Sequence, residues 1–265
     1  HDEKLQVMPH SVKSFIVSPY FKLFANAVFR DLRASSYNGD ETIASFVDRH
    51  FGVEFRSLFF DSLVSGIWAG DVTKMSISAS LPLLKRLERR SGSILRALIS
   101  FKANEVMCKK YSKNITSKAL FSFKSGIQQL VDSLKQELSE YIIYNAKIEN
   151  LEVTTSPQLT INGDRCSFSE IVSTIPAYKL SKYIDGDLSE LLASINYSPV
   201  AVQNVKMKKS EFNFDGFGFL VPSKEGSVVL GMVANNNIFP NHSSGEYIVN
   251  TVMMGGARYS IKSLK

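Results

Sequence analysis

The sequence contains few of the residues that build metal and disulfide sites. Cys108 and Cys166 are the only cysteines among 265 residues, there are four histidines, and none of these residues falls in a CxxC or HExxH spacing. We therefore expect neither a dedicated metal site nor a disulfide framework. Sparse cysteine also fits a reducing compartment.

Long apolar runs and dense basic runs are missing as well. No stretch approaches 18 apolar residues, so the sequence predicts no bilayer-spanning helix. The net charge of +6 indicates a solvated basic surface or one that meets anionic lipid or an anionic substrate. Lysines and arginines do not interleave with aromatic residues in a run, so we expect no nucleic-acid partner.

Apolar and aromatic residues are plentiful. Hydrophobic residues make up 44% of the chain, with 18 phenylalanines and 10 tyrosines, which fits an apolar pocket or a membrane-facing surface. The length suffices for one large domain or for two lobes with their own cores.

Helical periodicity dominates residues 1–118. Apolar spacings of three and four predict helices over 15–29, 43–51, 55–64 and 78–90. Asp40 is a candidate cap for the second helix, Gly52 ends it, and Pro82 stands in the first turn of the fourth. Basic residues gather near the end of that helix, where they favour the helix dipole or contact lipid headgroups: Lys85, Arg86, Arg89 and Arg90.

Residues 119–265 mix helices with strands. Helices are predicted over 126–139 and 177–183, and strands over 141–148, 151–154, 159–161, 167–175, 198–209, 228–234 and 247–254. The predicted fold class is α+β, with a mainly helical lobe over 1–118 and a mixed-sheet lobe over 119–265.

Four segments carry a family resemblance, in the same order along the chain. They are the run from Glu41 that leads into Leu63–Asp71 (LVSGIWAGD), Phe121–Leu130, Ile171–Ala177 (IVSTIPA), and Gly216–Ser223 (GFGFLVPS) with the later Thr251–Gly256 (TVMMGG). The second and third resemble the wider flavin amine oxidase superfamily. The first and last resemble protoporphyrinogen oxidases within it, and the resemblance extends over nearly the whole chain.

The resemblance implies a fold, a reaction and a location. The fold is that of a p-hydroxybenzoate hydroxylase- or amine oxidase-like FAD enzyme, with a helical membrane-associated lobe and a mixed-sheet substrate-binding lobe. The reaction oxidises protoporphyrinogen IX to protoporphyrin IX with FAD and oxygen, in haem biosynthesis. The implied partners are this substrate, oxygen, a membrane surface and a second copy in a homodimer. In eukaryotes the family sits peripherally at the mitochondrial inner membrane.

The resemblance also assigns binding residues, but no catalytic side chain. Substrate-binding positions would be Leu63, Gly66, Phe217, Gly218, Leu220, Val233 and Met253. The two glycines would let a flat ring approach the backbone. Cofactor-binding positions would be Ile142 on a strand, against the adenine, and Thr174, Ile175 and Pro176 near the isoalloxazine edge. Judged by residue type alone, the leucines are ordinary core residues and the glycines ordinary turn residues.

Parts of the family pattern are absent from this sequence. There is no GxGxxG turn for the FAD pyrophosphate, and the family's C-terminal segment and substrate-carboxylate arginine are missing. We therefore expect an internal piece of a longer enzyme, or a cleaved product, that holds FAD poorly and is inactive by itself. The alternatives are another flavin amine oxidase, such as a carotenoid desaturase-like enzyme, and a non-catalytic tetrapyrrole- or lipid-binding module.

Overall fold

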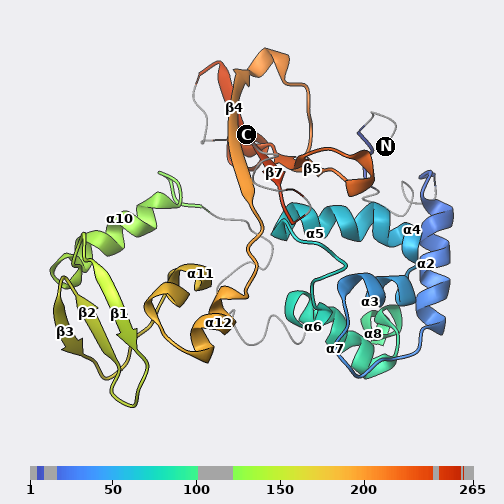
Figure 1. Cartoon of the computed structure of the whole chain (residues 1–265). Helices are drawn as coiled ribbons and strands as arrows, with labels where there is room; N and C mark the ends of the chain where they lie inside the picture. Colours follow the sequence, from blue (N-terminus) through green and yellow to red (C-terminus); the bar gives the residue numbers. More distant parts are fainter. Residues whose placement is uncertain (1–4, 9–16, 101–121, 241–244, 258, 260–265) are drawn as a thin grey trace. The chain divides into compact units, whose positions relative to one another are not determined.

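Two compact units make up the chain in the computed structural model, which describes residues 5–8, 17–100, 122–240, 245–257 and 259 (Figure 1). The first unit combines His1–Ser122 with Ser198–Lys265, and the second is Phe123–Tyr197. The division differs from the expected lobes 1–118 and 119–265, because the last part of the chain packs with the helices. The physical reason is that helix α5 (Asp61–Trp68) contacts strands β5 (Gly218–Leu220) and β6 (Val229–Val233).

The first unit begins with helices. They are α2 (Phe21–Arg33), α3 (Ile43–His50), α4 (Val53–Phe55), the π-helical η1 (Arg56–Phe60), α5 (Asp61–Trp68), α6 (Ile77–Ser80), α7 (Pro82–Ser91) and α8 (Ile94–Ser100). Their shared core is formed by Ile43, Phe46, Val47, Val64, Val72, Ile77, Leu87, Ile94 and Ala97. Among the described residues, no helix has both the length and the apolarity needed to cross a bilayer.

The predicted helices are present, with three corrections. The helix predicted over 15–29 is found at Phe21–Arg33, after a turn over residues 17–20. The helix expected over 78–90 is interrupted at Leu81 (φ −131°), because a residue before proline disfavours helical backbone, and α7 then begins at Pro82. The cap of α3 is Thr42, whose hydroxyl accepts from Ser45 N at 3.1 Å. Asp40, the predicted cap, instead accepts from Ser78 N at 3.4 Å. Gly52, at φ +95°, does follow the end of α3.

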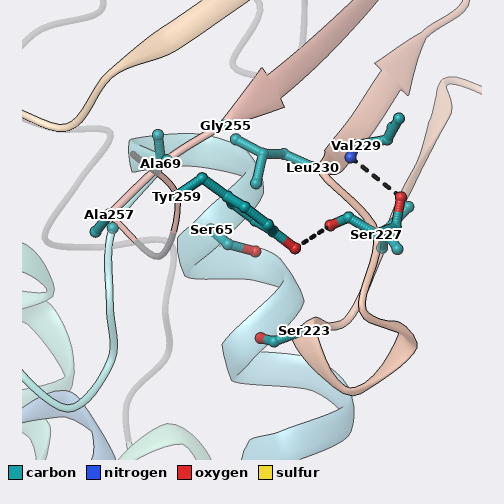
Figure 2. Close-up of a pocket in the computed structure, with 12 residues that line it drawn as sticks. Ser65, Ala69, Ser223, Ser227, Val229, Leu230, Gly255, Ala257 and Tyr259 are labelled. Atoms are coloured by element: carbon teal, nitrogen blue, oxygen red, sulfur yellow. Dashed lines mark hydrogen bonds between the residues drawn. The ribbon is translucent and has the colours of Figure 1, made fainter. Parts of the chain in front are cut away.

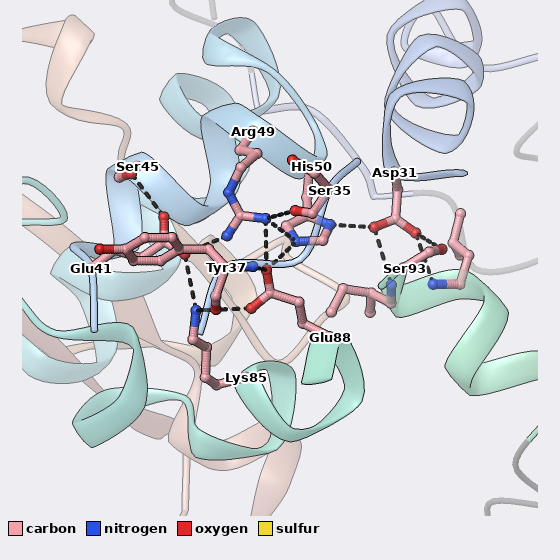
Figure 3. A network of polar contacts seen from close by, with 12 residues as sticks. Asp31, Ser35, Tyr37, Glu41, Ser45, Arg49, His50, Lys85, Glu88 and Ser93 are labelled. Atoms are coloured by element: carbon pink, nitrogen blue, oxygen red, sulfur yellow. Dashed lines mark hydrogen bonds and ion pairs between the residues drawn. The ribbon is translucent and has the colours of Figure 1, made fainter. Parts of the chain in front are cut away.

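A buried network of charged side chains joins α2, α3, α7 and α8 (Figure 3). His50, on α3, contacts the carboxylate of Asp31 through Nδ1 at 2.6 Å and that of Glu88 through Nε2 at 3.4 Å. Glu88 also pairs with Arg49 at 2.6 Å and with Lys85 at 2.8 Å. Lys85 is thus only 2% exposed and does not belong to a basic surface cluster.

Hydrogen bonds keep the two buried carboxylates ionised. Burial raises the pKa of Asp31, but hydrogen bonds from His50, Ser93 and two backbone N–H groups outweigh burial, so the pKa lies below its ordinary value. Burial likewise raises the pKa of Glu88, and Lys85, Tyr37 N and Arg49 lower it further than burial raises it. Because both groups are anionic acceptors, the network depends on their charge.

The first unit ends in a four-stranded antiparallel sheet of order β4-β7-β6-β5. Its strands are β4 (Val200–Lys208), β5 (Gly218–Leu220), β6 (Val229–Val233) and β7 (Tyr247–Gly255). Short helices η4 (Lys209–Glu211), η5 (Ser223–Glu225) and α13 (Asn235–Ile238) connect them. The strands predicted over 198–209, 228–234 and 247–254 are confirmed.

The second unit contains a small three-stranded antiparallel sheet, β1 (Ile148–Glu152), β2 (Gln158–Ile161) and β3 (Asp164–Ser167). Its helices are α10 (Gln128–Glu137), η2 (Ser139–Tyr141), α11 (Ala177–Leu180), η3 (Ser181–Tyr183) and α12 (Asp187–Ala193). The hairpin predicted over 151–161 and the helices predicted over 126–139 and 177–183 are confirmed.

Two predicted strands of this unit are wrong. The apolar run from Tyr141 reads as a strand, but Tyr141 ends η2 and Asn145 takes a left-handed conformation (φ +57°), so the first strand starts only at Ile148. Asparagine tolerates that conformation, which makes it a turn residue. The strand predicted over 167–175 ends at Ser167, and residues 168–175 form no regular element.

Candidate functional site

The sheet of the first unit presents two rows of residues that cross all four strands. Directly paired residues of antiparallel strands point to the same face. One row is Leu220, Gly231, Met253 and Val202, and the other is Gly218, Val233, Thr251 and Asn204. Each row spans three interstrand spacings, about 14 Å.

Helix α5 packs against this face near β5 and β6. Gly66 makes the contact possible, because a Cβ atom at this position would collide with the side chain of Leu220. Leu63 lies one turn before Gly66 on the same helix. Leu63 and Leu220 remain 37% and 41% exposed, so an apolar surface stays open beside the helix–sheet contact.

A buried carboxylate fixes α5 against the sheet. Asp61, in the first turn of α5, is 6% exposed and accepts hydrogen bonds from Ser223 N at 2.8 Å and from the Ser223 hydroxyl. Ser223 follows β5, where the motif Gly216–Ser223 ends. The two motifs of the first and last resembling segments therefore meet in space through a charge-assisted contact.

The glycines serve packing in this structure. A Cβ atom at Gly218 would collide with the carbonyl of Met232 on β6, and one at Gly231 would meet the carbonyl of Phe219 at 2.5 Å. At Gly66 and Gly218 the space of a missing side chain is taken by protein atoms. Both glycines therefore allow close packing within the protein, and the close approach of a flat ring to them stays a prediction.

Six of the seven residues predicted to bind substrate lie on α5 or on this sheet. Leu63 and Gly66 are on the helix, Gly218 and Leu220 on β5, Val233 on β6 and Met253 on β7. Phe217 directly precedes β5 and is 60% exposed. Sequence reasoning missed the other members of the two rows. Strand register, which aligns Val202 and Asn204 with them, is not visible in one sequence.

A small pocket opens where the C-terminal end of α5 meets the sheet (Figure 2). It contains about 280 Å³ of space, its open mouth included, and Ser65, Ser223, Ser227 and Tyr259 supply its hydroxyls. Tyr259 donates to Ser227 O at 2.5 Å and Ser65 to Ser62 O at 3.3 Å, so both hydroxyls are engaged within the protein.

The four positions predicted to bind the cofactor lie in the second unit. Ile142 was expected on a strand, but it follows η2 in an extended conformation and is half-buried. Pro176 is the residue before α11, and Thr174 and Ile175 precede it on an irregular segment. Ile175 is 46% exposed, and the neighbouring Val172 is 85% exposed.

This segment fits the ring edge of a flavin rather than its pyrophosphate. Exposed apolar side chains before Pro176 can cover the flat face or edge of an aromatic ring system. The segment is held in place from within the unit, since Ala177 N donates to the Tyr197 hydroxyl at 2.9 Å. No group of three metal-ligating side chains occurs within the part of the chain that the structure describes.

Comparison with known proteins identifies the class. Residues 3–262 match the family of flavin-containing amine oxidoreductases, and the chain belongs to this family. Membership makes FAD the cofactor.

Within this family the chain is similar to protoporphyrinogen oxidases. It is 27% identical to that of Dictyostelium discoideum, covering 87% of this chain and 49% of the relative, and 28% identical to that of Bos taurus, covering 96% and 56%. The chain thus spans about half the length of these relatives.

The fold agrees with a solved structure. A crystal structure of a candidate protoporphyrinogen oxidase from Exiguobacterium sp. 255-15 superposes with a TM-score of 0.71 at 16% identity, over 94% of this chain and 55% of the other. At this identity the superposition shows a shared fold.

Proposed function

We propose that this chain is the substrate-binding part of an enzyme that oxidises protoporphyrinogen IX to protoporphyrin IX with FAD and oxygen, in porphyrin and haem biosynthesis. The observation that carries the proposal is the apolar surface left exposed where α5 packs on the sheet: Leu220, which meets Gly66, is 41% exposed, and Leu63, one turn before Gly66, is 37% exposed. The similarity to protoporphyrinogen oxidases over most of the chain supports it.

The residues of this chain would bind and orient the substrate. Flat, apolar tetrapyrroles need an apolar wall, and the row of Leu220, Met253 and Val202 provides one along the sheet. The buried Asp61–Ser223 contact holds that wall at a fixed position against α5. Bound FAD supplies the redox chemistry, and the segment with Thr174, Ile175 and Pro176 would lie at its ring edge.

A membrane surface belongs to the same proposal. Helix α2 exposes Phe21, Val28 and Phe29 to between 42% and 54%. Phe24 of the same helix packs inward, with ring centroids 5.3 Å from Phe55 and 5.0 Å from Phe59. Helix α2 thus carries aromatic residues on both its packed and its exposed side.

The basic side chain of Arg33 stands 3.8 Å above the ring of Phe29 on the exposed side of α2. An apolar face flanked by cations is typical of helices that lie in a membrane interface. We propose peripheral attachment to the inner mitochondrial membrane, if the protein is eukaryotic, as a homodimer. A mitochondrial relative from Nicotiana tabacum, 27% identical over 82% of this chain, supports this location.

Porphyrin fluorescence tests the proposed reaction. The whole gene product, supplied with FAD, is mixed with protoporphyrinogen IX in air, and red fluorescence is followed over time. We expect a rise above autoxidation that is proportional to enzyme and depends on FAD. Bound flavin without such a rise would favour another flavin amine oxidase, such as a desaturase. Absence of both flavin and turnover would favour a non-catalytic binding module.

A further inference from the structure

The edge strand β4 changes in character along the open face of the sheet. Alternate residues of a strand share a face, so Val202, Asn204, Lys206 and Lys208 all point to the side of the two rows. The order along this face is apolar, polar and then basic. Val202 is 61% exposed and continues the apolar row, and Asn204 and Lys206 are exposed as well.

Asn204 is oriented by a chain of hydrogen bonds. The amide of Asn235 donates to the Thr251 hydroxyl at 2.8 Å, and that hydroxyl donates to Asn204 Oδ1 at 3.1 Å. The two hydrogen bonds run in the same direction, Asn235 to Thr251 to Asn204, and this series polarises the amide of Asn204. Because Oδ1 of Asn204 accepts, its Nδ2 group is the last donor of the series, on an exposed residue. Among the described residues, no acceptor contacts Nδ2.

The neighbouring charge indicates which acceptor fits this donor. Lys206 lies two residues along the same face, about 7 Å from Asn204. Its ammonium stands 4.2 Å from the ring centroid of Tyr247, which keeps it over the sheet. Within the part of the chain that the structure describes, Lys206 forms no ion pair. Lys208 and Lys209 follow Lys206 at this end of β4. Strand pairing brings Glu246, just before β7, to the same end, where the Glu246 carbonyl accepts from Lys209 N.

We propose that Asn204 and Lys206 bind a carboxylate of the substrate, with Thr251 and Asn235 positioning the Asn204 amide. This inference rests on the proposed function, because the substrate has an apolar tetrapyrrole ring and two carboxylates. We assign the carboxylate side of the substrate to the polar end of the sheet face. The ring lies along the row of Leu220, Met253 and Val202. Asn204 Nδ2 donates to a carboxylate oxygen, and Lys206 supplies the opposite charge.

Equilibrium binding tests the carboxylate site without requiring turnover. The probes are protoporphyrin IX, which carries two carboxylates, and its dimethyl ester, which carries none; Kd is measured by porphyrin fluorescence with the whole, FAD-loaded gene product. A hydrogen bond to a charged group contributes about 1.5–3 kcal/mol, so the wild-type protein should bind the diacid roughly 10- to 100-fold more tightly than the ester.

Asn204→Asp is the critical variant. This change keeps the oxygen that accepts from Thr251 but replaces the Nδ2 donor with a negative charge. Because residue 204 is exposed, we expect the fold to stay intact, which circular dichroism checks. Diacid binding should weaken roughly 10- to 100-fold while ester binding stays unchanged. Gln203→Glu is the matched control: it adds the same charge to an exposed amide on the opposite face of β4, and it should change neither Kd.

Two results would overturn the inference: equal wild-type affinity for diacid and ester, or equal weakening by Asn204→Asp and Gln203→Glu. Lys206→Met should reduce diacid selectivity in part, and no reduction would remove Lys206 from the site. Failure of the proposed function looks different. Diacid binding that is weakened by Asn204→Asp but not by Gln203→Glu, without porphyrin formation, would refute the reaction but retain the carboxylate site, whereas porphyrin formation with unselective binding would refute the site alone.

Discussion

Replacing Asp31 with asparagine tests how strongly the buried polar network stabilises the helices of the first unit. The Asp31 side chain is fully buried and accepts from His50 Nδ1 at 2.6 Å, the Ser93 hydroxyl at 2.6 Å, Ile94 N at 3.1 Å and Leu95 N at 2.8 Å. Asparagine has the same shape but no charge, and its amide group would face donors instead of accepting from them.

Breaking one partner of a buried ion pair typically destabilises a protein by about 3–5 kcal/mol. We expect Asp31→Asn to lower the free energy of unfolding by that amount, a large share of the roughly 5–15 kcal/mol of a native protein. Urea unfolding followed by circular dichroism measures it. Ser93→Ala removes one of the four hydrogen bonds to Asp31 and should lower the free energy of unfolding by about 1–3 kcal/mol. This variant replaces Asp31→Asn in the test if Asp31→Asn does not fold.

The control is Asp48→Asn. Asp48 pairs with Arg56 at 2.7 Å, but its side chain is 32% exposed, so its loss should cost at most about 1 kcal/mol. If Asp31→Asn and Asp48→Asn proved equally mild, the network would contribute little to stability, and the structural reasoning from burial would be refuted.

Two further predictions concern acid stability and the apolar wall. The pKa values of Asp31 and Glu88 are lowered in the folded state, so their stabilisation is fully present above their ordinary values of 3.8 and 4.5 and is lost as the pH falls below them. Urea midpoints should therefore be constant from pH 7 to about 5 and fall below about 4.5; a midpoint independent of pH down to 3 would contradict this. Leu220→Asp should abolish porphyrin formation but preserve folding and flavin content. Position 220 is 41% exposed, so a carboxylate there reaches water in the free protein, whereas a bound apolar substrate would bury it. The control Leu83→Asp changes a leucine of α7 that is 49% exposed and should retain turnover. Near-normal turnover of Leu220→Asp would show that Leu220 does not belong to the site.

Local chemistry made much of the secondary structure predictable. Gly52 and Pro82 mark helix boundaries because their backbone preferences act without help from distant residues. The same reasoning failed near Tyr141, where an apolar run with strand-like composition ends in a turn at Asn145. Strand propensity mainly measures how a side chain fits a sheet, so a run without a paired neighbour remains irregular.

The sequence identifies the family through motifs such as LVSGIWAGD and GFGFLVPS, and with the family the flavin cofactor. It did not determine which residues meet. Asp31 contacts Leu95 across 64 positions, and Asn204 meets Thr251 across 47, since strand pairing and helix packing bring these segments together. The burial of Lys85 and the packing of Leu220 against Gly66 become visible only in the folded structure. Contacts of this kind depend on register and packing between distant segments, which local residue preferences do not encode.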